Sequence, residues 1–296
     1  MHLFITGCNS FIGRELIRQC DAAGIQITGV DLSPSERPDC IVADICDEGI
    51  ASHIPQGVDS IVHLAGLTRD ADCKNQAKKC FQANVMGTLN LIDAAQAREA
   101  KQFIFASSEW VYDSFEPGVA KTEESPINAA KLTSEYAFSK YVSEVNLRQK
   151  YQHGFIPVTI LRFGIVYGPR PTNWSAVEAI LNTVATKNEV TVGALATGRR
   201  FIHVSDIASG ILAAVGLQGF EVVNLQGAHQ VSLGDVISES RALLHRDVVV
   251  AESNPSAPSI RLVDNAKAAS LLSWEPKISL SAGLESVATA LGHTNR

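Results

Sequence analysis

Short apolar runs alternate with longer stretches of helical spacing along most of the chain. The apolar runs have the length of buried strands, and they predict strands at residues 3–5, 25–30, 41–44, 60–65, 102–106 and 158–162. Between them, apolar residues recur at helical spacing after residue 14, over 72–98 and over 131–151. Alternating strands and helices predict an α/β fold in which helices cover a doubly wound parallel sheet.

The first strand runs directly into a turn that Gly7 and Gly13 bracket, and helical spacing follows. Backbone N–H groups at such a helix start bind a pyrophosphate. Asp31 ends the second strand, where a carboxylate binds an adenosine ribose and repels the 2′-phosphate of NADP. The pattern predicts a Rossmann-type NAD site, and an ordinary strand–helix turn is the alternative. Ser10 at the middle glycine position predicts a looser or reshaped turn, and Arg37 is expected to face solvent.

The pattern changes after residue 166, where the sequence becomes irregular and rich in proline. A return strand is predicted at 220–225, and the tail over 231–291 mixes helices with a strand at 248–250. No repeat or long linker separates the halves, so a smaller second domain is expected to be woven onto the first. We predict a Rossmann domain over 1–166 with a return segment at about 201–227, and a mainly substrate-binding α/β domain over 167–296.

Composition narrows the class of protein. The net charge of -6 argues against a nucleic-acid partner, which requires a basic surface. No apolar run has the length of a membrane span, and a strand beginning at residue 3 leaves no room for a secretory signal. All six cysteines lie in the first third without CxxC spacing, which favours reduced thiols over a metal site or a disulfide framework. We expect a cytoplasmic protein with a small-molecule partner, no membrane and no metal.

Tyr136 and Lys140 are one helical turn apart on the same face of a predicted helix. A nearby ammonium stabilises a phenolate, so Lys140 is expected to lower the pKa of Tyr136 and make it a usable acid or base. Ser108 follows the strand at 102–106, at the edge of the sheet where ligands bind. Its hydroxyl can donate to a carbonyl that undergoes hydride transfer. Chance juxtaposition of the Tyr–Lys pair, and a serine that only caps a loop, are the alternatives.

These motifs resemble the extended short-chain dehydrogenase/reductases of the NAD-dependent epimerase/dehydratase type. Matching pieces follow in family order almost from end to end, at residues 6–13, 31, 44–45, 63–66, 84–88, 107–108, 136–140, 161–162, 167–169, 199–206 and 271–276. The resemblance implies that NAD is the cofactor. It also implies three catalytic roles: Tyr136 exchanges the proton of a substrate hydroxyl, Lys140 binds the nicotinamide ribose, and Ser108 orients the reacting C–O group.

The resemblance further implies a set of cofactor-binding residues. Asp44 and Ile45 would hold the adenine, and residues 64–66 would line the pyrophosphate. Phe163 would pack near the nicotinamide, while Asn84 would bond to the cofactor side or serve only as a structural cap. With Tyr136 and Lys140, the set comprises Gly7, Asn9, Ser10, Phe11, Ile12, Gly13, Asp31, Leu32, Asp44, Ile45, Leu64, Ala65, Gly66, Asn84, Phe163 and Val166.

The substrate end departs from the family pattern. Glu109 occupies the place of an acid that protonates a leaving hydroxyl in dehydratases, but Trp110 follows where those enzymes have a second carboxylate. A solvated or hydrogen-bonded Glu109 is the alternative. Ile165 replaces an asparagine common in nucleotide-sugar binders, and residues 253–258 lack an RPGD-like turn. Arg199 and Arg261 remain as cations suited to a diphosphate. The predicted substrate-binding residues are Ser108, Glu109, Arg199 and Arg261.

We expect hydride transfer at a secondary alcohol or ketone of a sugar or nucleotide sugar, with 4-epimerase-like chemistry. A dehydrogenase or ketoreductase acting on a substrate without a nucleotide, and a non-catalytic NAD-binding module, are the alternatives. The missing second carboxylate argues against 4,6-dehydration. The helices predicted around 79–97 and 131–148 carry more apolar positions than one buried stripe needs, which predicts a homodimer joined through both, as in the family.

Overall fold

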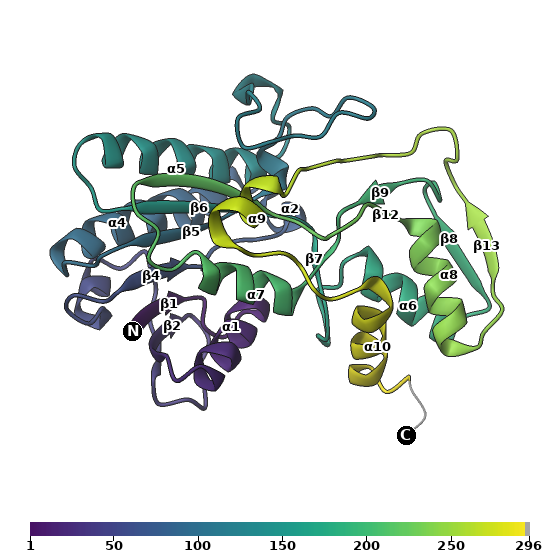
Figure 1. Cartoon of the computed structure of the whole chain (residues 1–296), viewed down its shortest axis with the longest axis horizontal. Coiled ribbons are helices and arrows are strands. Elements are labelled where there is room, and N and C mark those ends of the chain that lie inside the picture. Colours follow the sequence, from purple (N-terminus) through teal and green to yellow (C-terminus); the bar gives the residue numbers. More distant parts are fainter. Residues whose placement is uncertain (294–296) are drawn as a thin grey trace.

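The computed structural model describes residues 1–293, and its centre is a parallel sheet of seven strands (Figure 1). The strand order is β11-β6-β5-β4-β1-β2-β3. This confirms the predicted doubly wound α/β fold, with the segment at 220–225 as an edge strand. The strands are β1 (His2–Thr6), β2 (Gln26–Asp31), β3 (Cys40–Val42), β4 (Ser60–His63), β5 (Phe103–Ser108), β6 (Val158–Phe163) and β11 (Phe220–Leu225).

Helices cover both faces of this sheet and close two apolar cores. On one face α1 and α7 pack together, and Leu16, Ile207 and Ile211 are fully buried there. On the other face lie α4 and α5, which bury Leu91 and Leu147. The carboxyl edge of the strands stays open to ligands. The covering helices are α1 (Phe11–Ala22), α4 (Gly87–Ala97), α5 (Glu135–Gln152), α7 (Val204–Ala213) and α9 (Ala266–Leu272).

The prediction of one helix over 72–98 is wrong. The chain instead forms α2 (Asp70–Cys73), α3 (Ala77–Phe81), a π-helical turn (Gln82–Met86) and then α4. Asn75 interrupts the run because its backbone is left-handed, with φ 59°. Asparagine tolerates that conformation better than most residues do, so apolar spacing alone did not reveal the break.

Two other boundaries also differ from the prediction. The helix expected from residue 131 begins at Glu135, because the Ser134 hydroxyl accepts from the Ala137 N–H at 3.2 Å and caps it. A short 3₁₀ turn (Ala129–Lys131) precedes it. The strand expected at 41–44 ends at Val42, since the Asp44 carboxylate turns to accept from the Cys46 N–H at 2.8 Å. Further 3₁₀ turns span Glu48–His53 and Glu109–Val111.

The C-terminal elements enclose a third apolar core beside the sheet (Figure 1). β7 pairs with β10 and β8 with β13 in parallel, while β9 and β12 are antiparallel. The strand predicted at 248–250 falls on β13. The elements are β7 (Val166–Tyr167), β8 (Glu189–Val192), β9 (Gly198–Arg199), β10 (Ile202–His203), β12 (Val231–Ser232), β13 (Val249–Glu252), α6 (Ala176–Thr186), α8 (Leu233–Leu244) and α10 (Leu280–Ala290).

Two kinds of feature are missing from residues 1–293. No helix there is both long and apolar enough to cross a membrane. Within the same range, no three His, Cys, Asp or Glu side chains are grouped so that they could hold a metal ion.

Candidate active site

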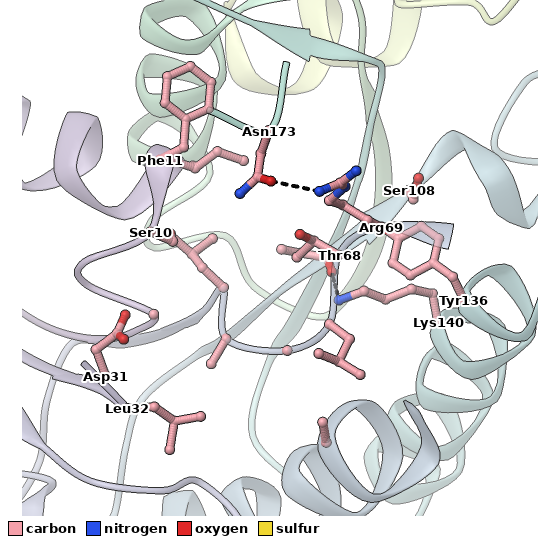
Figure 2. Close-up of a pocket in the computed structure, with 18 of the residues that line it drawn as sticks. Ser10, Phe11, Asp31, Leu32, Thr68, Arg69, Ser108, Tyr136, Lys140 and Asn173 are labelled. Carbon is pink, nitrogen blue, oxygen red and sulfur yellow. Dashed lines mark hydrogen bonds between the residues drawn. The ribbon is translucent and has the colours of Figure 1, made fainter. Parts of the chain in front are cut away.

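A cleft of about 1520 Å³ opens along the carboxyl edge of the sheet. It is lined by the turn after β1, the loops after β4, β5 and β6, the start of α5 and the segment 170–175. Figure 2 shows Asp31 and Leu32 towards one end of the cleft, and Ser108, Tyr136 and Lys140 towards the other. This is where a doubly wound sheet binds its ligands.

Most of the predicted cofactor residues line this cleft, and two do not. Gly13 lies against the turn itself, where a Cβ atom would come within 2.2 Å of the Gly7 carbonyl oxygen, so only glycine fits. Asn84 is buried away from the cleft. The predicted residues that do line it are Gly7, Asn9, Ser10, Phe11, Ile12, Asp31, Leu32, Asp44, Ile45, Leu64, Ala65, Gly66, Tyr136, Lys140, Phe163 and Val166.

Ser10 does not loosen the turn as predicted. Its backbone is extended, with φ -66°, so it avoids the positive φ that would strain a serine. Its hydroxyl accepts from the Gly13 N–H at 3.0 Å and caps α1. The positive φ falls instead on Gly7, at 73°. The turn therefore presents a capped helix N-terminus to the cleft, which fits a pyrophosphate.

Asp31 is held in place by several hydrogen bonds at one end of the cleft (Figure 2). Its carboxylate accepts from the Asn9 N–H at 3.0 Å and from the N–H and hydroxyl of Ser33 at 2.9 and 2.8 Å. Arg37 does not simply face solvent, because its guanidinium pairs with Asp21 and Asp39 at 2.7 and 2.8 Å.

Ser108, Tyr136 and Lys140 lie together at the other end of the cleft. Ser108 is the last residue of β5, while Tyr136 and Lys140 come from the first two turns of α5. The Lys140 ammonium donates to the Ala106 carbonyl at 2.8 Å and lies 4.8 Å from the centre of the Phe105 ring. Burial lowers its pKa to about 8.

The pKa of Tyr136 is not lowered as predicted. Burial raises it to about 12, and the Ser108 hydroxyl only partly opposes that rise by bonding to the phenol. A buried phenolate loses its hydration, and this cost is the main cause of the raised pKa.

A buried ion pair holds the carboxyl end of β5 in place. The Arg162 guanidinium on β6 makes two hydrogen bonds to the Glu144 carboxylate, at 3.0 and 2.7 Å. That carboxylate also accepts from the Ser107 hydroxyl, and Arg162 donates to the Tyr112 hydroxyl at 3.1 Å. Glu144 belongs to α5, so the network ties the strand that carries Ser108 to the helix that carries Tyr136.

Asn84 connects the loop after β4 to α5. Its amide donates to the Leu67 carbonyl at 3.0 Å and to the Ser139 hydroxyl at 2.9 Å, and it accepts from the Leu67 N–H at 2.7 Å. All of these bonds are internal. The geometry therefore agrees with the structural alternative rather than with a direct bond to the cofactor.

Glu109 is neither solvated nor exposed to the cleft. It is 1% exposed, one carboxylate oxygen has no partner, and the other faces the Gln226 amide at 3.0 Å. Burial raises its pKa to about 7, although the Arg261 and Arg199 charges oppose that rise. The solvated form of the alternative is thus wrong, whereas the contact with Gln226 agrees with its hydrogen-bonded form, and Glu109 is a buried acid outside the cleft lining.

The two predicted substrate arginines also lie outside the cleft lining. Arg199 donates to the Gly198 and Ser259 carbonyls at 2.7 and 2.5 Å, so part of its guanidinium serves the protein itself. Arg261 stacks on Trp110 at 4.6 Å from the ring centre. Trp110 does line the cleft, beside Ser108.

The sequence analysis did not single out Arg69, Asn173 and Arg170, which also line the cleft. The Arg69 guanidinium donates to the Asn173 side-chain oxygen at 2.6 Å (Figure 2). The Arg170 guanidinium lies 4.5 Å from the centre of the Phe11 ring. Arg69 lies a few residues after the end of β4. Ligands bind at the carboxyl ends of the strands, so the rule that indicated Ser108 after β5 indicates Arg69 as well. No pattern in the sequence connects it to Asn173.

A dinucleotide turn at β1, together with Ser, Tyr and Lys side chains in one cleft, defines an NAD-dependent enzyme of the extended short-chain dehydrogenase/reductase type. The chain belongs to the NAD-dependent epimerase/dehydratase family, whose model matches residues 3–225. This finding confirms the predicted family, enzyme class and cofactor.

Individual relatives cover nearly the whole chain. The UDP-glucose epimerase YtcB of Bacillus subtilis, which is itself uncharacterized, is 29% identical over 96% of both chains. A dTDP-4-dehydro-6-deoxy-D-allose reductase of Streptomyces is 24% identical over 97% of this chain and 94% of its own. The UDP-glucose 4-epimerase of Thermus thermophilus, solved with NAD, superposes with a TM-score of 0.85 at 21% identity over 99% of both chains. These relatives differ in reaction, so the family alone leaves the activity open.

Proposed function

We propose that the protein transfers a hydride at C4 of a nucleotide sugar and returns it to either face, as a 4-epimerase does. The observation that carries this proposal is the convergence of Ser108, Tyr136 and Lys140 in the same cleft as the dinucleotide turn. The name of the 29% identical relative, a UDP-glucose epimerase, supports it.

In this proposal Tyr136 takes the proton of the C4 hydroxyl and later returns it to the ketone oxygen. The capped start of α1, Asp31 and Lys140 would hold NAD, which would supply a reversible hydride acceptor for C4. Ser108 donates to the same oxygen and so stabilises the charge that develops there. Lys140 has three N–H donors, and those not bonded to Ala106 are available to the nicotinamide ribose. Its ammonium is protonated at neutral pH, since burial lowers its pKa only to about 8.

Dehydration fits the site less well. Elimination needs an acid at the leaving hydroxyl and a base next to the ketone, both within hydrogen-bond reach. Glu109 faces Gln226 rather than the cleft, and Trp110 stands in the place of a second carboxylate. We therefore rank oxidation–reduction and epimerisation above dehydration.

Turnover of sugar nucleotides in deuterated water tests this ranking. The proposal predicts a 4-epimer with no deuterium next to C4 and no loss of mass. A product that has lost one water and carries solvent deuterium next to the ketone would place the enzyme among the dehydratases.

A dehydrogenase or ketoreductase acting on a substrate without a nucleotide is the second candidate. Ile165 favours it, because its side chain packs against the apolar core of the C-terminal elements and offers no hydrogen bond to a nucleotide. The hydrogen bond of Arg199 to Ser259 points the same way.

For a substrate that does carry a diphosphate, we infer that Arg261, stacked on Trp110, is the more available cation.

We further propose that residues 167–296 form most of the substrate-binding domain. We also propose that the protein is a cytoplasmic homodimer. The dimer is supported by exposed apolar side chains on the π-helical turn and α5: Met86 is 50% exposed, and Phe138 and Val145 are each 39% exposed. The cytoplasmic location is supported by six cysteines that are all free thiols.

A further inference from the structure

The segment 168–175, which joins β7 to α6, crosses the cleft and is attached on both sides. On the side of α1, the Arg170 guanidinium lies 4.5 Å from the centre of the Phe11 ring. On the side of β4, Asn173 accepts a hydrogen bond from Arg69 at 2.6 Å (Figure 2). The partners Arg69 and Asn173 are 104 positions apart in the chain. They bring together the loop after β4 and the C-terminal half.

The attachment on the α1 side is buried and firm. Arg170 forms an ion pair with Glu178 at 2.7 Å, and Glu178 is fully buried in α6. The same guanidinium donates to the Val166 carbonyl at 3.2 Å. Gly168 packs closely as well, since a Cβ atom there would lie 3.1 Å from the Phe11 ring. This end of the segment is therefore part of the fixed structure.

The attachment on the β4 side is a single exposed contact between two anchored backbones. The neighbouring Asp70 carboxylate accepts from the Ser134 hydroxyl, which holds the loop that carries Arg69. Asn173 has a left-handed backbone with φ 59°, and the Trp174 indole N–H next to it donates to the Arg170 carbonyl at 2.9 Å. Among residues 1–293, the Arg69–Asn173 bond is the one hydrogen bond between these two loops.

A dinucleotide that reaches both ends of this cleft would run past the Arg69–Asn173 contact, which lies between them (Figure 2). Its adenosine end belongs at Asp31, its pyrophosphate at the capped start of α1, and its nicotinamide end at Tyr136 and Lys140. Arg69 and Asn173 line the cleft between these ends. We propose that Arg69 and Asn173 form a clasp that keeps NAD in the site between turnovers. This deepens the proposed function and rests on it, because an epimerase must return the hydride it has taken and gains from a resident cofactor.

The release rate of the cofactor tests the clasp. The holoprotein loaded with NADH is mixed with excess NAD⁺, and the fall in bound-NADH fluorescence gives the rate. Asn173→Gly is the informative variant, because glycine keeps the left-handed backbone and the variant does not change the charge of the cleft. Asn173→Gly and Arg69→Met should each raise the release rate roughly threefold to tenfold, which is the net worth of one ordinary hydrogen bond and suits an exposed contact.

The double variant and a matched control complete the test. If the two side chains act through their mutual bond, the double variant releases NADH no faster than the faster single variant. Asn188→Ala removes a similar bond from Arg246, at 3.2 Å, outside the cleft, and should leave the rate unchanged. An unchanged rate in Asn173→Gly, or effects that multiply in the double variant, would overturn the clasp. Epimerase activity is measured separately, so its absence would refute the proposed function without affecting the release rates.

Discussion

Tyr136 is the side chain on which the proposed chemistry depends most. Tyr136→Phe removes the hydroxyl that exchanges the substrate proton, so kcat should fall by about 10²-fold or more while NAD affinity stays nearly the same. Lys140→Ala should weaken both, because in the proposed mechanism its ammonium binds the nicotinamide ribose and lies beside Tyr136. Steady-state kinetics and an NAD titration check this, with Tyr151→Phe at the far end of α5 as the control. Near-normal turnover by Tyr136→Phe would make the catalytic assignment wrong.

Glu109 makes the free energy of unfolding depend on pH, and one substitution can separate its contribution from that of other groups. Because its pKa is raised from 4.5 to about 7, the folded state binds more protons than the unfolded state between these values. The free energy of unfolding therefore falls as pH rises through this window, by on the order of 2–3 kcal/mol. Glu109→Gln lacks this titration. The melting temperature of Glu109→Gln, relative to that of the wild type, should rise from pH 5 to pH 8. A constant difference between the two melting temperatures would mean that Glu109 stays ionised.

At the residue scale, the sequence predicted the positions of side chains better than it predicted their pKa values. The positions of Ser108, Tyr136 and Lys140 followed from strand ends and helical spacing. The pKa of Tyr136 did not, because burial depends on tertiary packing that spacing does not contain. Ser10 was judged by its residue type, yet the positive φ of the turn falls on Gly7 instead.

At the element scale, the start of α5 positions Tyr136, the proposed catalytic tyrosine. Ser134 caps the helix and also donates to Asp70 in the loop after β4. Ser134→Ala should lower the free energy of unfolding by about 1 kcal/mol and should also reduce kcat, because Tyr136 sits in the first turn. Chemical denaturation and kinetics measure the two effects. Ser279→Ala at the α10 cap is the control, and it should cost similar stability without a change in kcat; equal kcat losses in both variants would contradict this role.

The elements themselves were predictable where apolar spacing was regular. The strands of the sheet, including the one at 220–225, followed from short apolar runs. The helix expected over 72–98 did not, because a left-handed Asn75 breaks it without changing the spacing of apolar residues. From Ala77 the helical run is continuous and contains a π-helical turn. Capping by Ser134 could have been anticipated, since serine is a preferred N-cap.

At the scale of the whole molecule, the exposed apolar face of α5 predicts self-association. Phe138 and Val145 are each 39% exposed, and Phe138 packs on Phe81 with ring centres 5.6 Å apart. Light scattering at micromolar concentration should give the mass of a dimer. Val145→Lys places a charge on this face and should shift the mass towards that of a monomer. A monomer mass for the wild type would reject the dimer.

Contacts between distant parts of the chain were the least predictable. Arg69 and Asn173 meet across 104 positions, and Arg261 finds Trp110 only through the packing of the C-terminal half. A single sequence records no such pairing. The cleft could therefore be predicted from its strand ends, whereas the segment that crosses it became visible only in three dimensions.

The central claim is that a hydride leaves C4 of a nucleotide sugar and returns to it within one binding event. Sugar nucleotides deuterated at C4, with UDP and dTDP as the nucleotides, test it directly by mass spectrometry and NMR of the products. The account predicts a 4-epimer that retains the deuterium at C4, with no reduced cofactor free in solution. Deuterium found in free NADH beside a keto sugar, or lost to solvent, would contradict it.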